Sequence, residues 1–169
     1  MDSSVYLQSE MFEHEKEYFK SKSVSLPDCL IRAGSLNHME RDTDNLSYPF
    51  YEKVLESRKG CYLFFDNYRL REDVVDLLSL YVGKSKQLHK RLYRHWATQG
   101  NQIDKYTQSI LFGDSDYDVD LGFIGKHHLG TLQPSCEIQI AIWLEPNERE
   151  LMFLEHELIY KLRPILNKA

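Results

Sequence analysis

The sequence of 169 residues has few residues that would bind a structural zinc ion or form disulfides. Its three cysteines, Cys29, Cys61 and Cys136, are far apart. Neither they nor the seven histidines show the short spacings of zinc knuckles or redox pairs. We therefore expect reduced thiols in the core and no structural zinc.

Long apolar runs and a basic amino-terminal patch are also missing. The longest apolar stretches cover a few residues, whereas a membrane-spanning helix needs roughly 20. The first 20 residues are acidic and amphipathic, unlike a secretory signal. We therefore expect an intracellular, cytoplasmic protein without a membrane segment. The hydrophobic content of 42% is enough for the core of one domain.

Basic residues are the minority, at 21 against 26 acidic residues, yet they concentrate in one place. The segment Leu80–Trp96, "LYVGKSKQLHKRLYRHW", contains five of them and no acidic residue. A local positive excess suits a phosphate backbone, whereas the overall net charge of -5 predicts weak non-specific binding. The five residues are Lys84, Lys86, Lys90, Arg91 and Arg94.

Hydrophobic periodicity predicts an α+β fold. Helical patterns cover residues 9–20, 49–56, 85–98 and 148–163, and strands are predicted at "CYLFF", "LYVG" and "CEIQIAIWLE". Ser85 and Asn147 are the predicted N-caps of the last two helices, and Pro164 ends the final one. We expect a small three-stranded, mostly antiparallel sheet flanked by helices.

Four aspartates alternate in "GDSDYDVDLGF", at positions 114, 116, 118 and 120. Such alternation occurs in calcium loops, but the glutamate that closes an EF-hand at the twelfth position is missing. We favour a solvated acidic turn over a calcium site.

Glu155 lies among the apolar residues of the predicted final helix. At roughly 100° per residue, it falls within the face formed by Leu151, Leu154, Leu158, Ile159 and Leu162. A carboxylate there needs a partner, because burying an unpaired charge costs several kcal/mol. A lysine or arginine in a structural ion pair would satisfy it, and so would a divalent metal ion.

The preceding helix favours the metal. Arg91 and His95 are four residues apart and therefore share one border of its apolar stripe. A permanent cation, an imidazole and a buried carboxylate over one small sheet form a set suited to phosphoryl transfer.

Two tripeptides, "GCY" at 60–62 and "YVG" at 81–83, precede a helix with leucine, arginine and histidine in "KSKQLHKRLYRHW". The segment "LEHELIYKLRPILN" then closes the pattern with a glutamate, an apolar helix, a proline and an asparagine. Together these four ordered segments resemble the GIY-YIG nucleases. The resemblance covers residues 60–97 and 137–167.

The resemblance also implies which reaction the protein catalyses and which residues form its site. It implies hydrolysis of a phosphodiester with one Mg²⁺ or Mn²⁺ ion held by Glu155, transition-state charge neutralised by Arg91, and a structural role for Asn167. The general base stays open between Tyr62, Tyr81 and His95. The family positions are Tyr62, Tyr81, Lys84, Arg91, His95, Glu155 and Asn167, and we expect Lys86, Lys90 and Arg94 to contact the nucleic-acid backbone.

The spacing departs from the family. The two signature tyrosines are 81 − 62 = 19 positions apart, which indicates an insertion at about 66–79. A helical turn through Val74, Val75, Leu77 and Leu78 is one interpretation. A second insertion at about 99–135 suits a binding loop or lid. We therefore divide the chain into a partly helical amino-terminal extension, 1–58, and a nuclease domain, 59–169.

The expected function is a metal-dependent endonuclease acting on DNA, of restriction type or another stand-alone kind encoded by a bacterium or phage. RNA as substrate and a homodimer both stay open. The alternative is a non-catalytic module that keeps the fold and binds nucleic acid or protein. Such a module would be marked by loss of a catalytic residue, and none is lost.

Overall fold

The computed structural model describes residues 5–7, 10–31, 55, 57–71, 74–97, 133–134, 139–165 and 167. It is an α+β fold built on one sheet with strand order β1-β2-β6-β3-β4, and β5 pairs with β3 beside this path. Every strand pair is antiparallel. The predicted class and antiparallel pairing are therefore confirmed.

A long hairpin forms one side of the sheet. Strand β3, Gly60–Arg71, pairs with β4, Val74–Ser85, and with β6, Gln139–Leu144, on its other side. The insertion at 66–79 therefore extends the hairpin, and the expected helical turn is wrong. Alternate residues of the added stretch face the core, as the buried Leu77 does. This period of two residues is typical of a strand.

The amino-terminal segment adds strands that the sequence did not predict. Strand β2, Cys29–Ile31, pairs with β6, and β1, Val5–Leu7, pairs with β2. With β5, Gln133–Pro134, the described residues form six strands, so the expected three-stranded sheet is too narrow. Strands of two or three residues are too short to show a hydrophobic period, and their partners are distant in sequence.

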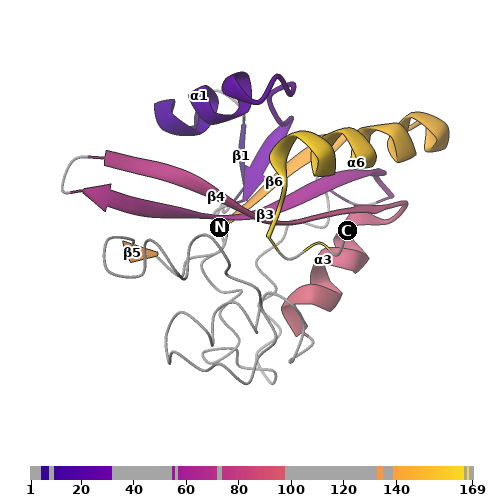
Figure 1. Ribbon diagram of the computed structural model, residues 1–169. Helices are drawn as coiled ribbons and strands as arrows, with labels where there is room; N and C mark the ends of the chain where they lie inside the picture. Colours follow the sequence, from indigo (N-terminus) through magenta and orange to yellow (C-terminus); the bar gives the residue numbers. More distant parts are fainter. Residues whose placement is uncertain are drawn as a thin grey trace.

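Helices cover both faces of the sheet (Figure 1). Helices α1, Glu13–Ser21, and α6, Glu148–Leu162, lie on one face, and α3, Leu88–Ala97, lies on the other. Successive side chains of β3 point to opposite faces, so Cys61 packs towards α6 and Tyr62 packs towards α3. The sheet therefore carries a core on each side.

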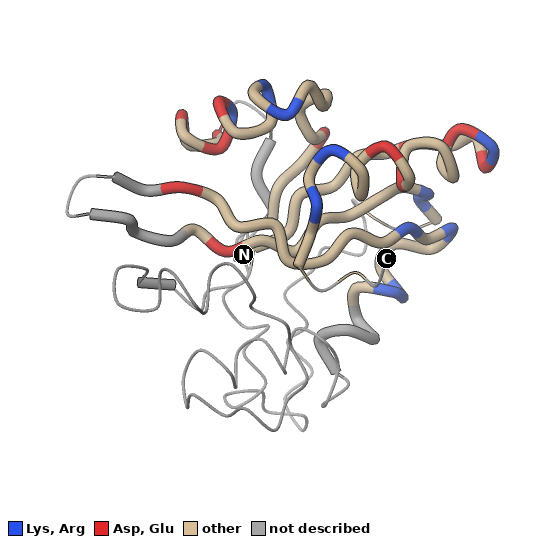
Figure 2. The backbone as a smooth tube through the Cα atoms, viewed as in Figure 1, with Lys and Arg blue, Asp and Glu red and all other residues tan. Residues whose placement is uncertain are grey.

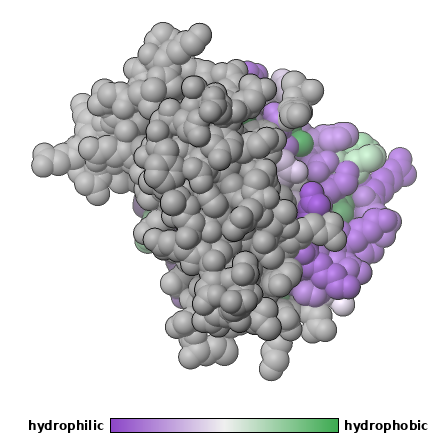
Figure 3. Space-filling model, turned by 90° about the horizontal axis from the view of Figure 1, so that it is seen from below, coloured by the Kyte–Doolittle hydropathy of each residue, from purple (hydrophilic) through white to green (hydrophobic). Residues whose placement is uncertain are grey.

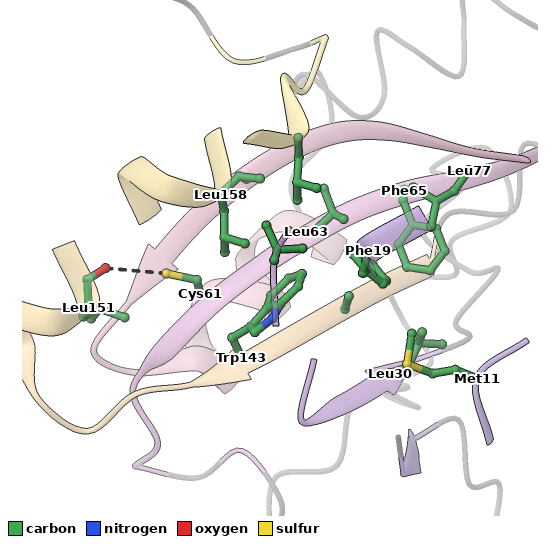
Figure 4. Close-up of a cluster of buried hydrophobic side chains, with 14 residues drawn as sticks. Met11, Phe19, Leu30, Cys61, Leu63, Phe65, Leu77, Trp143, Leu151 and Leu158 are labelled. Atoms are coloured by element: carbon green, nitrogen blue, oxygen red, sulfur yellow. Dashed lines mark hydrogen bonds between the residues drawn. The ribbon is translucent and has the colours of Figure 1, made fainter. Parts of the chain in front are cut away.

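The core beneath α1 and α6 is aromatic and aliphatic (Figure 4). Leu63 and Phe65 of β3 belong to this core, Leu63 lies close to Trp143 of β6, and the Phe19 ring of α1 meets Trp143 edge to face, with ring centroids 5.5 Å apart. Cys61 donates a hydrogen bond to the Leu151 carbonyl. Cys29 and Cys61 are free buried thiols, as expected, and Cys136 lies outside the described residues.

A β-bulge interrupts the hairpin next to Tyr81. The register passes from Phe64 opposite Tyr81 to Phe65 opposite Ser79, which leaves Leu80 as an extra residue. Leu80 and Tyr81 therefore both face α3, although they are consecutive. Tyr81 lies on the same face as Tyr62 because it pairs with Phe64, two residues after Tyr62 on β3.

The helix ends agree in part with the predicted caps. The Asn147 side chain accepts hydrogen bonds from the backbone N–H groups of Arg149 and Glu150, and Arg163 ends α6 in the left-handed conformation, with φ 48°, before Pro164. Ser85 is not the N-cap of α3: it ends β4, and its hydroxyl accepts from Gln87 N.

Several predictions fall outside the described residues. These are most of the helix at 49–56, the acidic turn at 114–120 and nearly all of the insertion at 99–135. Among the helices that the structure describes, none combines the length and apolarity needed to cross a bilayer.

Candidate functional site

Tyr62 and Arg91 form the part of the site on the α3 face. Nε of Arg91 donates a hydrogen bond of 3.2 Å to the Tyr62 hydroxyl, and the Tyr62 and Tyr81 rings lie 6.3 Å apart between centroids. The hydrogen bond to Tyr62 is the main cause that raises the pKa of Arg91, and a hydrogen bond to Tyr81 adds to it. The guanidinium is therefore oriented by both signature tyrosines.

Gly60 and Gly83, the signature glycines, are required by close approach of other groups. A Cβ atom on Gly83 would lie 2.5 Å from Cζ of Tyr62 and overlap its hydroxyl. A Cβ atom on Gly60 would overlap the Trp143 carbonyl on the neighbouring strand. Gly83 thus makes room for the Tyr62 ring directly across the hairpin, where the two residues are paired.

Burial makes Tyr62 a weak acid. Desolvation is the main cause that raises its pKa to about 12, and the charge of Glu155 also raises it, while the hydrogen bond from Arg91 lowers it. The side chain is fully buried. Tyr62 is therefore neutral near pH 7 and accepts from Arg91 as a phenol, which disfavours it as the general base of the free protein.

We predict that the Tyr62 phenol loses its proton at a higher pH than an exposed tyrosine does. The difference in absorbance at 295 nm between the wild type and Tyr62→Phe should rise with a midpoint near pH 12. The raised pKa also means that Tyr62 contributes stability that is fully present below about pH 10 and is lost as the pH rises through about 12. A difference titration centred near 10 would contradict the buried environment.

Lys84 and Glu155 form the part of the site on the opposite face. Lys84 Nζ lies 3.2 Å from Oε1 of Glu155, and the two side chains are 41% and 18% exposed. Glu155 lies at the border of the apolar face of α6, and its positively charged partner is Lys84. The sequence allows either a basic side chain or a metal ion as the partner of Glu155, and the structure shows the basic side chain of Lys84 in that place.

Asn167 joins the carboxyl-terminal segment to the edge of β4. Its Oδ1 accepts from Val82 N at 2.8 Å and its Nδ2 donates to Val82 O at 2.9 Å. A side-chain amide offers both groups, as a neighbouring strand would. Ile165 N also donates to Ser79 O. Asn167 thus binds backbone and supports the strand that carries Tyr81 and Lys84, which agrees with a structural role.

Basic residues gather where β4 leads into α3 (Figure 2). Lys86 and Lys59 lie 3.4 and 3.1 Å from the two carboxylate oxygens of Glu148, at the start of α6. The bridge to Glu148 was not predicted, because these residues are about 60 to 90 positions apart. Lys90 is exposed. The side chains of Arg94 and His95 lie outside the description, although both residues belong to α3.

The two parts of the site meet at one end of the sheet. Tyr62 lies opposite Gly83 in the hairpin, and the adjacent pair is Cys61 opposite Lys84. Glu155 is close enough to Tyr62 to contribute to its raised pKa. Viewed from the α3 side, the described surface is largely hydrophilic (Figure 3). Carboxylate, lysine and arginine are therefore grouped around the end of β4.

Glu155 is the carboxylate that the sequence analysis expects to bind a divalent metal ion. Among the described residues no group of three or more histidine, cysteine, aspartate or glutamate side chains is placed to hold a metal. Glu155 offers partly exposed carboxylate oxygens beside Lys84. Mg²⁺ commonly keeps several waters and binds one or two carboxylates together with substrate phosphates. A single carboxylate suits such a cation and does not suit structural zinc.

Comparison with protein-family models, curated proteins and solved structures gives no match.

Proposed function

We propose that the protein is a metal-dependent endonuclease of the GIY-YIG type that hydrolyses phosphodiester bonds in DNA. The observation that carries this proposal is the arrangement around the end of β4. There Arg91 is held by Tyr62 on one side of the hairpin and Glu155 is held by Lys84 on the other. These are the residue types that phosphoryl transfer requires.

Arg91 stabilises charge on the scissile phosphate. Its guanidinium is planar, remains protonated and presents several donors. Tyr62 accepts from Nε and Tyr81 accepts a further hydrogen bond, which leaves the remaining N–H groups of the guanidinium to donate to phosphate oxygens. Because the buried Tyr62 ring cannot turn freely, the guanidinium is oriented before substrate arrives.

Glu155 would hold the Mg²⁺ or Mn²⁺ ion. When bound, the metal supplies a Lewis acid that polarises the phosphate and stabilises the leaving oxygen. Lys84 lies beside the same carboxylate and can donate to a phosphate oxygen. Tyr62 positions Arg91 while neutral, so Tyr81 and His95 are the candidates for orienting or deprotonating the attacking water.

The basic residues around the site favour a phosphate backbone as the substrate. Lys86 and Lys90 are exposed near the start of α3 and supply sequence-independent attraction. Since the chain as a whole is acidic, with a net charge of -5, we expect this attraction to be local and strongly dependent on salt. A stand-alone or restriction-type enzyme fits this distribution, and DNA is the first substrate to test.

The test is nicking of supercoiled plasmid with Mg²⁺ or Mn²⁺. We expect wild-type protein to convert the plasmid to open-circular or linear forms, and Glu155→Gln to be slower by at least about 100-fold because the metal carboxylate is lost. Glu157→Gln is the matched control. It lies on the same helix, pairs with Lys161 and is more exposed, so it should cut at the wild-type rate.

Two results would overturn the proposal. One is the absence of metal-dependent cleavage of DNA and of structured RNA by the wild type. The other is equal cleavage by Glu155→Gln and the wild type. Binding of DNA without cleavage would favour the non-catalytic binding module.

A further inference from the structure

Lys84 and a divalent cation would compete for the same carboxylate. Lys84 Nζ lies 3.2 Å from Oε1 of Glu155, in an ion pair whose carboxylate is mostly covered. The Glu155 side chain is only 18% exposed, so one positive partner already satisfies much of its electrostatic need. A second cation at this carboxylate would be repelled by the first.

Lys84 has freedom to move away from the carboxylate. Its side chain is 41% exposed, and lysine has a flexible four-carbon stem with a strongly hydrated charge. Its backbone, in contrast, is held in the hairpin opposite Cys61. The ammonium group can therefore leave Glu155 for a nearby anion without any change in the sheet.

We infer that Lys84 is an internal counter-ion of Glu155 which a divalent cation must displace, so that Lys84 weakens metal binding to the free protein. This inference rests on the proposed metal role of Glu155. The displaced ammonium finds a new partner when a phosphate group enters the site, and the metal and the nucleic acid therefore favour each other's binding.

The neighbouring lysine provides a matched control. Lys86 lies two residues further along the chain, is 68% exposed and pairs with Glu148 instead of Glu155. Lys84→Met and Lys86→Met remove the same charge and keep an unbranched apolar stem. Only Lys84→Met frees Glu155. A general effect of net charge would appear equally in both variants.

The experiment measures Mn²⁺ binding to the full chain without nucleic acid, from the loss of the free-ion signal in electron paramagnetic resonance. We expect Lys84→Met to bind Mn²⁺ about fivefold more tightly than the wild type, the upper end for a partly exposed ion pair. We expect Lys86→Met to bind within about twofold of the wild type, because screening weakens more distant charges. Glu155→Gln should lose this binding.

Each of the other possible results would overturn either the counter-ion role of Lys84 or the metal role of Glu155. Unchanged or weaker Mn²⁺ binding by Lys84→Met, or an equal gain in both lysine variants, would overturn the counter-ion role and leave the proposed nuclease intact. Undiminished binding by Glu155→Gln would overturn the metal assignment itself and the inference with it. Cleavage rates are not needed for either conclusion.

Discussion

Replacing Gly83 with alanine is expected to lower DNA cleavage by about 100-fold, the cost of displacing an aligned catalytic group. The new Cβ would lie 2.5 Å from Cζ of Tyr62, and that ring is fully buried. Moving the ring breaks its hydrogen bond with Arg91. Overpacking should also lower the free energy of unfolding by about 1–3 kcal/mol.

Two measurements on the purified variant separate these effects. Chemical denaturation gives the change in stability, and cleavage is then measured at a temperature where the variant is fully folded. Wild-type cleavage together with an unchanged denaturation midpoint would show that Tyr62 does not need the space above Gly83. That outcome would contradict the close packing of Tyr62 against Gly83.

Replacing Arg91 with alanine should slow cleavage by about 10²–10³-fold, as for loss of one preorganised donor to developing charge. The fold should persist, since Arg91 is only partly buried and its loss leaves Tyr62 as a neutral phenol. The measurement is the single-turnover rate on plasmid with saturating Mg²⁺.

Arg91→Lys separates charge from geometry. Lysine keeps the positive charge but lacks the planar group that donates to Tyr62 and to phosphate together. We expect an intermediate rate, below the wild type and above Arg91→Ala. A full rate with lysine would mean that the orientation imposed by Tyr62 has no catalytic part.

The ends of β3 and β4 next to Gly60 and Gly83 could be predicted because their signals are local. Apolar runs next to Gly60 and Gly83, a polar cap at Asn147 and Pro164 beyond the last helix each act within a few residues. The amino-terminal strands could not be predicted in this way. Cys29–Ile31 becomes a strand through pairing with Gln139–Leu144, more than 100 positions away.

The sequence predicted which residues belong to the candidate site better than it predicted which of them contact one another. Burial geometry and the family motif both selected Glu155, but neither chose its partner, because Lys84 precedes it by 71 positions and any cation would serve. The bulge at Leu80 was also invisible, since one extra residue in a strand leaves no compositional mark. These tertiary details determine which face each group occupies.

The ion pairs also explain how an acidic chain carries a basic cluster. Lys84 pairs with Glu155, and Lys59 and Lys86 share Glu148, so the first half of α6 supplies acids to the lysines beside the hairpin. In the free protein much of the local positive charge is therefore balanced. Arg91, in contrast, donates to the hydroxyl groups of tyrosines and keeps its full charge for an anion.

The central claim is that Arg91 on one face of the hairpin and Glu155 on the other act on the same phosphate. A double-mutant cycle of single-turnover cleavage, with wild type, Arg91→Ala, Glu155→Gln and the double variant, tests it directly. Residues that act as one unit are strongly non-additive, so we predict that the double variant is within about threefold of the slower single variant. Multiplication of the two separate losses would show independent action and contradict a shared site.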